Sequence, residues 1–209
     1  MKKIKIKICG QTNPAIIEHC LNIGVDQQGL IFYEKSPRNL EYGTLQIINQ
    51  YFQSYKNKFV GVFVNPTLKE IEEKLNVFDF NTIQLHGSEN QSTINEIYHH
   101  FKKDIYKSIS PINFQNTTLK NVVKFLIESE PSKNDQPGGN NKTWDWNDFK
   151  NSQDLPFILS GGLNQDNLSQ AINLTGANFV DINSGVEKIK GEKNLSLIAY
   201  NKNLLPLAP

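Results

Sequence analysis

The sequence predicts a single (β/α)8 barrel, the TIM-barrel form of the α/β class, that forms one domain over residues 1–209. Eight short runs rich in Val, Ile and Phe recur along the chain, and longer amphipathic stretches separate them. No shift in composition marks a domain boundary, and 209 residues lie near the lower limit for such a barrel. Eight strands that alternate with helices favour this barrel over a six-stranded doubly wound sheet.

Each expected strand is a short apolar segment whose side chains alternate between two faces. In the first strand, Ile4, Ile6 and Ile8 form an apolar face, and Cys9 shares the other face with lysines. A thiol therefore stands at the carboxyl end of this strand, which is the end where (β/α)8 enzymes carry out chemistry. The strands are expected at Lys3–Ile8, Gln28–Tyr33, Phe59–Val64, Thr82–His86, Ile105–Ile109, Val122–Glu128, Pro156–Ser160 and Asn178–Asn183.

The segments between the strands have helical patterns, and Asn13-Pro14, Pro66-Thr67 and Asn164 are helix-start signals. Two segments fit a helix less well, because Asn113–Leu119 is short and Lys142–Asp154 is broken. The other helices are expected at Pro14–Ile23, Leu40–Phe52, Leu68–Asn76, Gln91–Phe101 and Gln165–Leu174, with a last one from about Leu195.

Charge and cysteine content exclude several classes of protein. The 22 basic and 21 acidic residues are evenly mixed and give a net charge of +1, which lacks the electrostatic footprint of a nucleic-acid or membrane binder. Cys9 and Cys20 fit neither a redox pair nor a zinc spacing, and we expect no metal site. No apolar run reaches transmembrane length and no signal peptide is recognisable, so we expect a soluble cytoplasmic protein.

Three loops at the expected carboxyl ends of strands are candidate ligand sites. Gly161 and Gly162 follow the seventh strand, and Ser184 and Gly185 follow the eighth. Glycines let consecutive backbone N–H groups approach an anion, and barrel enzymes commonly bind phosphate in these two loops. The stretch Ser129–Asn141 after the sixth strand has low structural propensity, and we expect it to cover a substrate.

Two further side chains at the same end of the barrel suit a small ligand. Arg38, the single arginine of the chain, follows the second strand, where its guanidinium could bind a carboxylate through paired hydrogen bonds. Gln84 and His86 share a face of the fourth strand and point into the barrel if Leu85 packs on the helices. His86 is therefore expected to contact the ligand.

Seven motifs follow one another along the chain. They are Lys7-Ile-Cys-Gly10; Gly29-Leu-Ile-Phe-Tyr33 with Lys35-Ser-Pro-Arg38; Val60-Gly-Val-Phe-Val-Asn65; Gln84-Leu-His-Gly87; Gly138-Gly139 with Lys142-Thr-Trp-Asp-Trp146; Ser160-Gly-Gly-Leu-Asn164; and Asp181-Ile-Asn-Ser-Gly-Val-Glu187. Together, and in this order, they closely resemble the phosphoribosylanthranilate isomerase family from the first strand to the last. The resemblance implies a (β/α)8 barrel without a cofactor, which is a monomer or a homodimer and acts on a small phosphosugar.

The resemblance also implies a reaction, the Amadori rearrangement of N-(5-phosphoribosyl)anthranilate in tryptophan biosynthesis. Such a reaction needs a base at the sugar C2 and an acid near the ring oxygen, on opposite sides of the sugar. By resemblance, Cys9 is the base, and Lys7 either favours its thiolate or pairs with a buried carboxylate such as Asp181. Arg38 would bind the anthranilate carboxylate and Asp181 a sugar hydroxyl. The phosphate would bind at Gly161, Gly162, Ser184 and Gly185.

The general acid is the position where the sequence departs from the family, which has an aspartate at the end of strand six. Glu128 is the nearest match, and Glu130 and Asp135 are alternatives. Glutamate keeps the carboxyl group but adds a methylene, and a misplacement of about 1 Å can cost ~10²-fold in rate. Two smaller departures are Asn141 in place of a loop glycine and Asn183 in place of a serine. A barrel that binds phosphosugars with impaired catalysis is the alternative interpretation.

Overall fold

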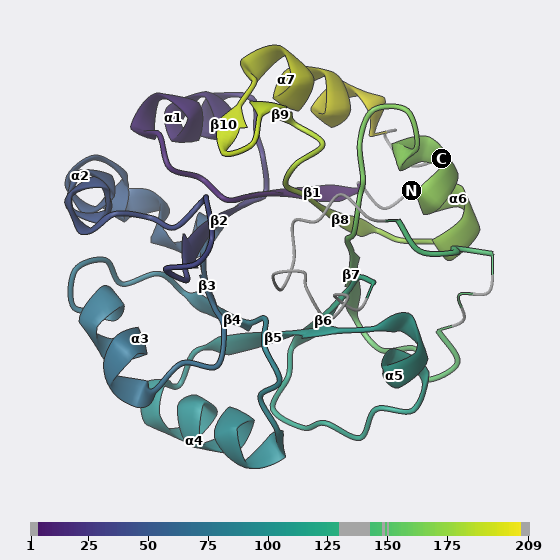
Figure 1. Ribbon diagram of the computed structural model, residues 1–209, viewed down its shortest axis with the longest axis horizontal. Helices are drawn as coiled ribbons and strands as arrows, with labels where there is room; N and C mark the ends of the chain where they lie inside the picture. The colour runs from purple at the N-terminus through teal and green to yellow at the C-terminus, as the bar shows by residue number, and fades with distance from the viewer. Residues whose placement is uncertain (1–3, 130–142, 148, 150, 206–209) are drawn as a thin grey trace.

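The computed structural model describes residues 4–129, 143–147, 149 and 151–205. Eight parallel strands close into a barrel in chain order, and the helices pack around its outside (Figure 1). The predicted (β/α)8 fold is thus confirmed. The strands are β1 Lys5–Cys9, β2 Gln27–Phe32, β3 Phe59–Phe63, β4 Thr82–Leu85, β5 Asp104–Ile109, β6 Lys124–Ile127, β7 Phe157–Leu159 and β8 Phe179–Ile182.

Local sequence signals set the helix ends. Asn13 caps α1 through a hydrogen bond from the Ala15 backbone N–H, and Thr67 and Glu70 form a reciprocal capping box at α3. The helices are α1 Pro14–Asn22, α2 Tyr42–Phe52, α3 Leu68–Leu75, α4 Gln91–Phe101, α5 Pro111–Gln115, α6 Leu168–Thr175 and α7 Leu195–Leu204, with the 3-10 turn η1 Gln53–Lys58 after α2.

Two predicted helices were wrong in position or kind. The helix expected at Asn113–Leu119 begins instead at Pro111, because proline fits the first helical turn, and it ends at Gln115. None of the described residues of the segment 142–154 is helical. There the Asp145 carboxylate accepts a hydrogen bond from the Asn147 backbone N–H, a local turn that competes with a helix.

The structure also contains a hairpin that was not predicted. Strands β9 Glu187–Ile189 and β10 Glu192–Lys193 pair antiparallel directly after β8. Gly191 takes a φ of +89° in its turn, which a residue with a side chain rarely adopts. In Figure 1 the hairpin lies beside β1 and below α7, next to the carboxyl end of the barrel.

Alternation along the strands divides the core into two layers. Outward residues such as Ile6 and Ile8 pack against the helices, while Val60, Tyr106 and Ile158 fill the barrel interior. The next interior layer toward the carboxyl end is polar, and it is the layer from which the site is built. Among the described residues, no helix is long and apolar enough to cross a bilayer.

Candidate active site

The thiol and an ion pair lie together on the β1–β8 side of the barrel. Cys9 ends β1, and Lys7 lies one pleat below it on the same face, with both side chains buried. The parallel register pairs Lys7 with Asp181 of β8, and the Lys7 ammonium donates a 2.9 Å hydrogen bond to Oδ2 of Asp181. Of the two roles considered for Lys7, the pairing with Asp181 is confirmed.

The charges in this cluster depend on one another. Burial lowers the pKa of Lys7, but Asp181 and the neighbouring Cys9 outweigh burial and raise that pKa to about 12. Lys7 is therefore a permanent cation below the thiol. Burial also raises the pKa of Cys9, against the opposing pull of Lys7 and of Lys193 from β10. In the absence of a ligand the group at the end of β1 is a thiol with two cations near it.

Gly29 of β2 leaves room for the Sγ atom of Cys9. The register places Gly29 opposite Cys9, and a Cβ atom on Gly29 would lie 2.6 Å from Sγ of Cys9. Such a contact is far shorter than van der Waals packing permits. Gly29 is therefore part of the site, although in the sequence it was noted only as a residue of the Gly29–Tyr33 motif.

Arg38 is held by a carboxylate of the chain itself. Its Nε and Nη2 donate to the two oxygens of Glu187 at 2.6 and 2.7 Å, a bidentate pair buried from solvent. Lys193 donates to Glu187 at 2.8 Å and to the side chain of Asn183 at 2.7 Å. Burial raises the pKa of Glu187, but Arg38 and Lys193 outweigh burial and lower it to about 2. Nη1 of Arg38 has no partner among the described residues and is the nitrogen that can meet a ligand.

The two segments predicted to bind phosphate lie against each other. Asn164, after β7, and Gly185, after β8, form an isolated parallel bridge. Gly161 and Gly162 have positive φ values of 90° and 65°, and a Cβ on Gly185 would lie 1.9 Å from the carbonyl oxygen of Leu163. Both loops thus need glycine to adopt this conformation, which brings backbone close to backbone at one corner of the barrel mouth.

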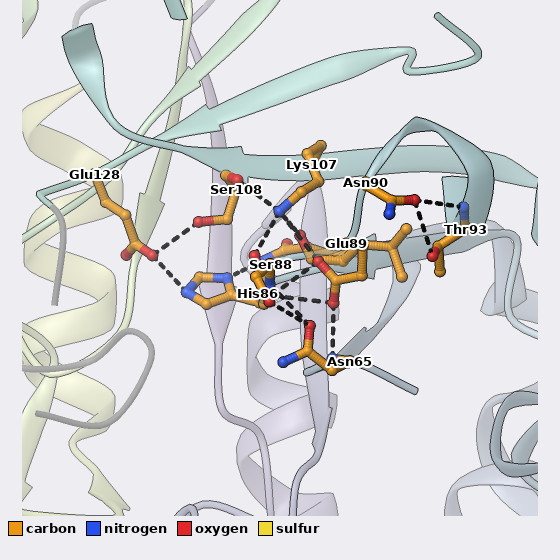
Figure 2. Close-up of polar contacts among 12 residues, drawn as sticks. Asn65, His86, Ser88, Glu89, Asn90, Thr93, Lys107, Ser108 and Glu128 are labelled. Atoms are coloured by element: carbon orange, nitrogen blue, oxygen red, sulfur yellow. Dashed lines mark hydrogen bonds and ion pairs between the residues drawn. The ribbon is translucent and has the colours of Figure 1, made fainter. Parts of the chain in front are cut away.

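The β4–β6 side of the mouth carries the imidazole and the carboxylate (Figure 2). His86 follows β4 and Glu128 follows β6, and Nε2 of His86 lies 2.5 Å from Oε1 of Glu128, outside hydrogen-bond alignment. Ser108 of β5 donates to the same oxygen at 3.0 Å. Burial raises the pKa of Glu128, but the charge of His86, the hydrogen bonds and Lys7 together lower it.

A second buried ion pair lies behind this carboxylate. Nζ of Lys107 lies 3.1 Å from Oε2 of Glu89 and donates to the carbonyl oxygens of Gly87 and Ser108. Glu89 also accepts from the backbone N–H groups of Asn65 and Gly87. These contacts tie the loops that follow β3 and β4 to strand β5, as Figure 2 shows. A cavity of about 520 Å³ opens beside them and is lined in part by His86 and Glu128.

The structure therefore gathers the predicted site residues at one end of the barrel. Glu128 lies in this site, whereas Glu130, Asp135 and the motif residues Gly138, Gly139 and Lys142 lie outside the described residues. The sequence analysis missed Ser108, Glu187 and Lys193 as site residues. Ser108 could have been found from its alternation with Tyr106, but no sequence signal shows that Lys193 turns back toward Asn183. Among the described residues, no three His, Cys, Asp or Glu side chains are grouped to hold a metal ion.

Comparison with known proteins gives the family. The family model for N-(5'-phosphoribosyl)anthranilate (PRA) isomerase matches residues 6–201. The N-(5'-phosphoribosyl)anthranilate isomerase of Sinorhizobium fredii is 31% identical over 204 residues, which cover 94% of this chain and 90% of the relative.

Solved structures give the same fold. The phosphoribosyl anthranilate isomerase of Thermus thermophilus superposes with a TM-score of 0.82 at 21% identity, covering 96% of this chain and 98% of that one. Another, solved in complex with reduced 1-(o-carboxyphenylamino)-1-deoxyribulose 5-phosphate, superposes with a TM-score of 0.73 at 26% identity, covering 96% and 97%. The chain thus belongs to the N-(5'-phosphoribosyl)anthranilate isomerase family and is an isomerase built on a (β/α)8 barrel.

Proposed function

We propose that this chain converts N-(5-phosphoribosyl)anthranilate to 1-(2-carboxyphenylamino)-1-deoxyribulose 5-phosphate, with Cys9 as general base and Glu128 as general acid. The observation that carries the proposal is the buried thiol on one wall of the barrel mouth and the largely buried carboxylate on another. Lys7 acts electrostatically on both groups, which supports their lying near each other at the barrel mouth. A base and an acid on separate walls suit a reaction that needs both at different atoms of one sugar.

The first chemical step is opening of the furanose ring. Protonated Glu128 gives its proton to the ring oxygen, and the bond between that oxygen and C1 breaks. The lone pair of the anthranilate nitrogen forms the C=N bond, which leaves an iminium cation and the Glu128 carboxylate. Proton donation by a well-placed side chain is worth typically ~10²–10⁴-fold in rate.

The second step is removal of the proton from C2. The Cys9 thiolate takes this proton, and the bonding electrons move toward the cationic nitrogen to form the enolamine. Transfer of the C2 hydroxyl proton and protonation of C1 then give the ketone product. Lys7 and Lys193 both favour the thiolate, so they oppose the effect of burial on Cys9.

Each of the three parts of the substrate has its own binding residues in this proposal. The phosphate would lie against the backbone at Gly161, Gly162, Ser184 and Gly185, where glycine-rich loops leave room for an anion. Arg38 would direct Nη1 to the anthranilate carboxylate while Glu187 holds the rest of the guanidinium. Asp181 would accept a hydrogen bond from a sugar hydroxyl through Oδ1, which is buried and has no hydrogen-bond partner among the described residues. The ligand named for the related complex has the same three parts, a carboxyphenyl group, a pentulose and a phosphate.

The test is turnover of the substrate, followed by the loss of its anthranilate fluorescence on mixing with the enzyme. We expect the fluorescence to fall with wild-type protein and to persist with Glu128→Gln. Phosphosugar binding without a fluorescence change in the wild type would contradict the proposal and favour the catalytically impaired barrel. That alternative draws on Glu128, which departs from the aspartate of the family.

A further inference from the structure

The two oxygens of the Glu128 carboxylate have different surroundings. Oε1 accepts a 3.0 Å hydrogen bond from Oγ of Ser108 and lies 2.5 Å from Nε2 of His86. Neither contact involves Oε2. Figure 2 shows both dashed lines reaching the same oxygen, from β5 on one side and from the loop after β4 on the other.

We propose that His86 and Ser108 are positioning residues that occupy Oε1 of Glu128 and so leave Oε2 as the oxygen that carries and donates the proton. This inference rests on the proposed role of Glu128 as the general acid. An oxygen that already accepts from Ser108 and lies against the imidazole nitrogen of His86 is a poor place for a proton, because a hydrogen on it would face the hydrogens of its neighbours. The proton is therefore favoured on the other oxygen.

The length of glutamate makes such positioning necessary. A glutamate side chain has one more rotatable bond than the aspartate of the family, and fixing long side chains costs conformational entropy. Two contacts, one from strand β5 and one from the loop after β4, restrict the direction of the carboxylate. The 1 Å error that an added methylene could introduce is thereby prevented, and errors of that size can cost ~10²-fold in rate.

Gln84 contacts the ring nitrogen of His86 that does not face Glu128. Its Nε2 lies 2.9 Å from Nδ1 of His86, and Gln84 itself is fully buried inside β4. An amide N–H that donates to Nδ1 leaves the imidazole hydrogen on Nε2, the nitrogen that faces Glu128. Oε1 of Gln84 has no hydrogen-bond partner among the residues that the structure describes. Gln84 thus contacts the imidazole through its amide nitrogen and orients the ring toward Glu128.

The charge of His86 then affects the acid. A cationic imidazole favours the ionised carboxylate of Glu128, and a neutral imidazole does not. The other charges near the pair balance one another, since Lys7 of β1 pairs with Asp181 of β8 and Lys107 of β5 pairs with Glu89. His86 is consequently the neighbouring group whose positive charge most favours the ionised carboxylate of Glu128.

The first test replaces Ser108. We expect Ser108→Ala to lower kcat about 10-fold with an unchanged KM, because a hydrogen bond to a charged group is lost while the binding contacts remain. Ser108→Thr keeps the hydroxyl and should recover most of kcat. Ser92→Ala, an exposed serine on α4, is the matched control and should leave kcat unchanged. An unchanged kcat in Ser108→Ala, with an active wild type, would overturn the inference.

The second test replaces His86 and follows the pH profile. His86→Gln keeps a donor for Oε1 but cannot become cationic, so the pKa of Glu128 should rise. The alkaline limb of kcat, along which the acid loses its proton, should therefore move to higher pH. His99→Gln, on the exposed face of α4, should leave the profile in place. If the alkaline limb of the kcat profile lies at the same pH in His86→Gln as in the wild type, the inference is contradicted.

A third measurement needs no turnover. The ¹⁵N NMR spectrum of His86, assigned by its loss in His86→Gln, should show the hydrogen on Nε2 in the neutral ring and should change in Ser108→Ala. A hydrogen on Nδ1 would overturn the arrangement. Inactivity of the wild type combined with the expected spectrum would instead refute the proposed function and, with it, the donor role of Oε2.

Discussion

The two sides of the barrel mouth each contain a buried lysine paired with a carboxylate, but the two lysines face opposite ways. Lys7 points into the barrel and pairs with Asp181 directly below Cys9. Lys107 lies on the other face of its strand and pairs with Glu89 in the loops around it. The inward lysine sets the charge around the reactive thiol, whereas the outward one fixes the loops behind Glu128. The proposed base therefore has two cations near it, whereas the proposed acid is held by a hydrogen bond from Ser108 and an ion pair with His86.

The largest expected effect is on the base. Cys9→Ser should lower kcat by about 10³-fold or more, because a serine hydroxyl is far weaker as a base at neutral pH than a thiolate. Phosphate binding, measured by calorimetry, should remain. Cys20→Ser removes the other buried thiol, outside the barrel interior, and should keep turnover within a few-fold of wild type. Unchanged turnover in Cys9→Ser would remove the thiol from the mechanism.

On the side of the mouth that carries Glu128, the largest expected effect is a loss of folding stability. Glu89→Gln leaves Lys107 buried without its carboxylate, which typically costs about 3–5 kcal/mol. For a chain of this size we expect a fall in Tm on the order of 10 °C, measured by calorimetry. Glu73→Gln is the control, since Glu73 pairs with Lys69 on the exposed face of α3 at 3.9 Å, and such pairs contribute about 0–1 kcal/mol. Equal Tm values in the two variants would show that Lys107 does not need its partner.

Gly29→Ala should test the Cys9 side of the mouth by itself, because it changes the position of the thiol without changing any charged residue. The new methyl group would displace Sγ of Cys9, and a misplacement near 1 Å can cost ~10²-fold in rate. We expect kcat to fall by that order. Gly43→Ala, at a glycine with open space around it on α2, is the control. A kcat near wild type in Gly29→Ala would show that the thiol tolerates movement.

The smallest effect should be at Arg38. If Nη1 binds the substrate carboxylate equally in the ground and transition states, Arg38→Ala should raise KM about 10-fold with little change in kcat. Glu187 keeps Lys193 as a partner in this variant, which limits the loss of stability. Arg38→Lys should give an intermediate KM, because lysine keeps the positive charge but lacks the planar guanidinium that donates paired hydrogen bonds. A defect confined to kcat would place Arg38 in the chemical step instead.

The sequence predicted the barrel almost completely, because period-two alternation and short apolar runs are local signals. All eight strands lie within two residues of their expected ends, and α4 at Gln91–Phe101 matches its prediction. The helix expected at Lys142–Asp154 failed because side chain to backbone bonding at Asp145 is a weak signal in a single sequence. The hairpin that carries Lys193 was missed for a different reason, since two strands of two and three residues hardly differ from a loop.

For the site, the sequence offered Asp181 as one partner for Lys7 but did not reveal the other contacts between distant residues. Lys7 and Asp181 are 174 positions apart, and their pairing follows from the register of β1 against β8. The pairing of Arg38 with Glu187 depends on a hairpin that the sequence did not reveal. Local patterns determine which face a side chain occupies, whereas contacts between distant segments depend on the closed barrel.

The distance in sequence between Arg38 and Glu187 has a consequence for assembly. These residues are 149 positions apart, and the segment with Glu187 follows the last barrel strand. A chain truncated before β8 would lack both the partner of this arginine and one of the two glycine loops. With the proposed binding mode, a ligand stabilises only the closed barrel, and folding intermediates that lack β8 gain no stability from substrate. Saturating product should accordingly slow global unfolding while leaving the stability of such fragments unchanged.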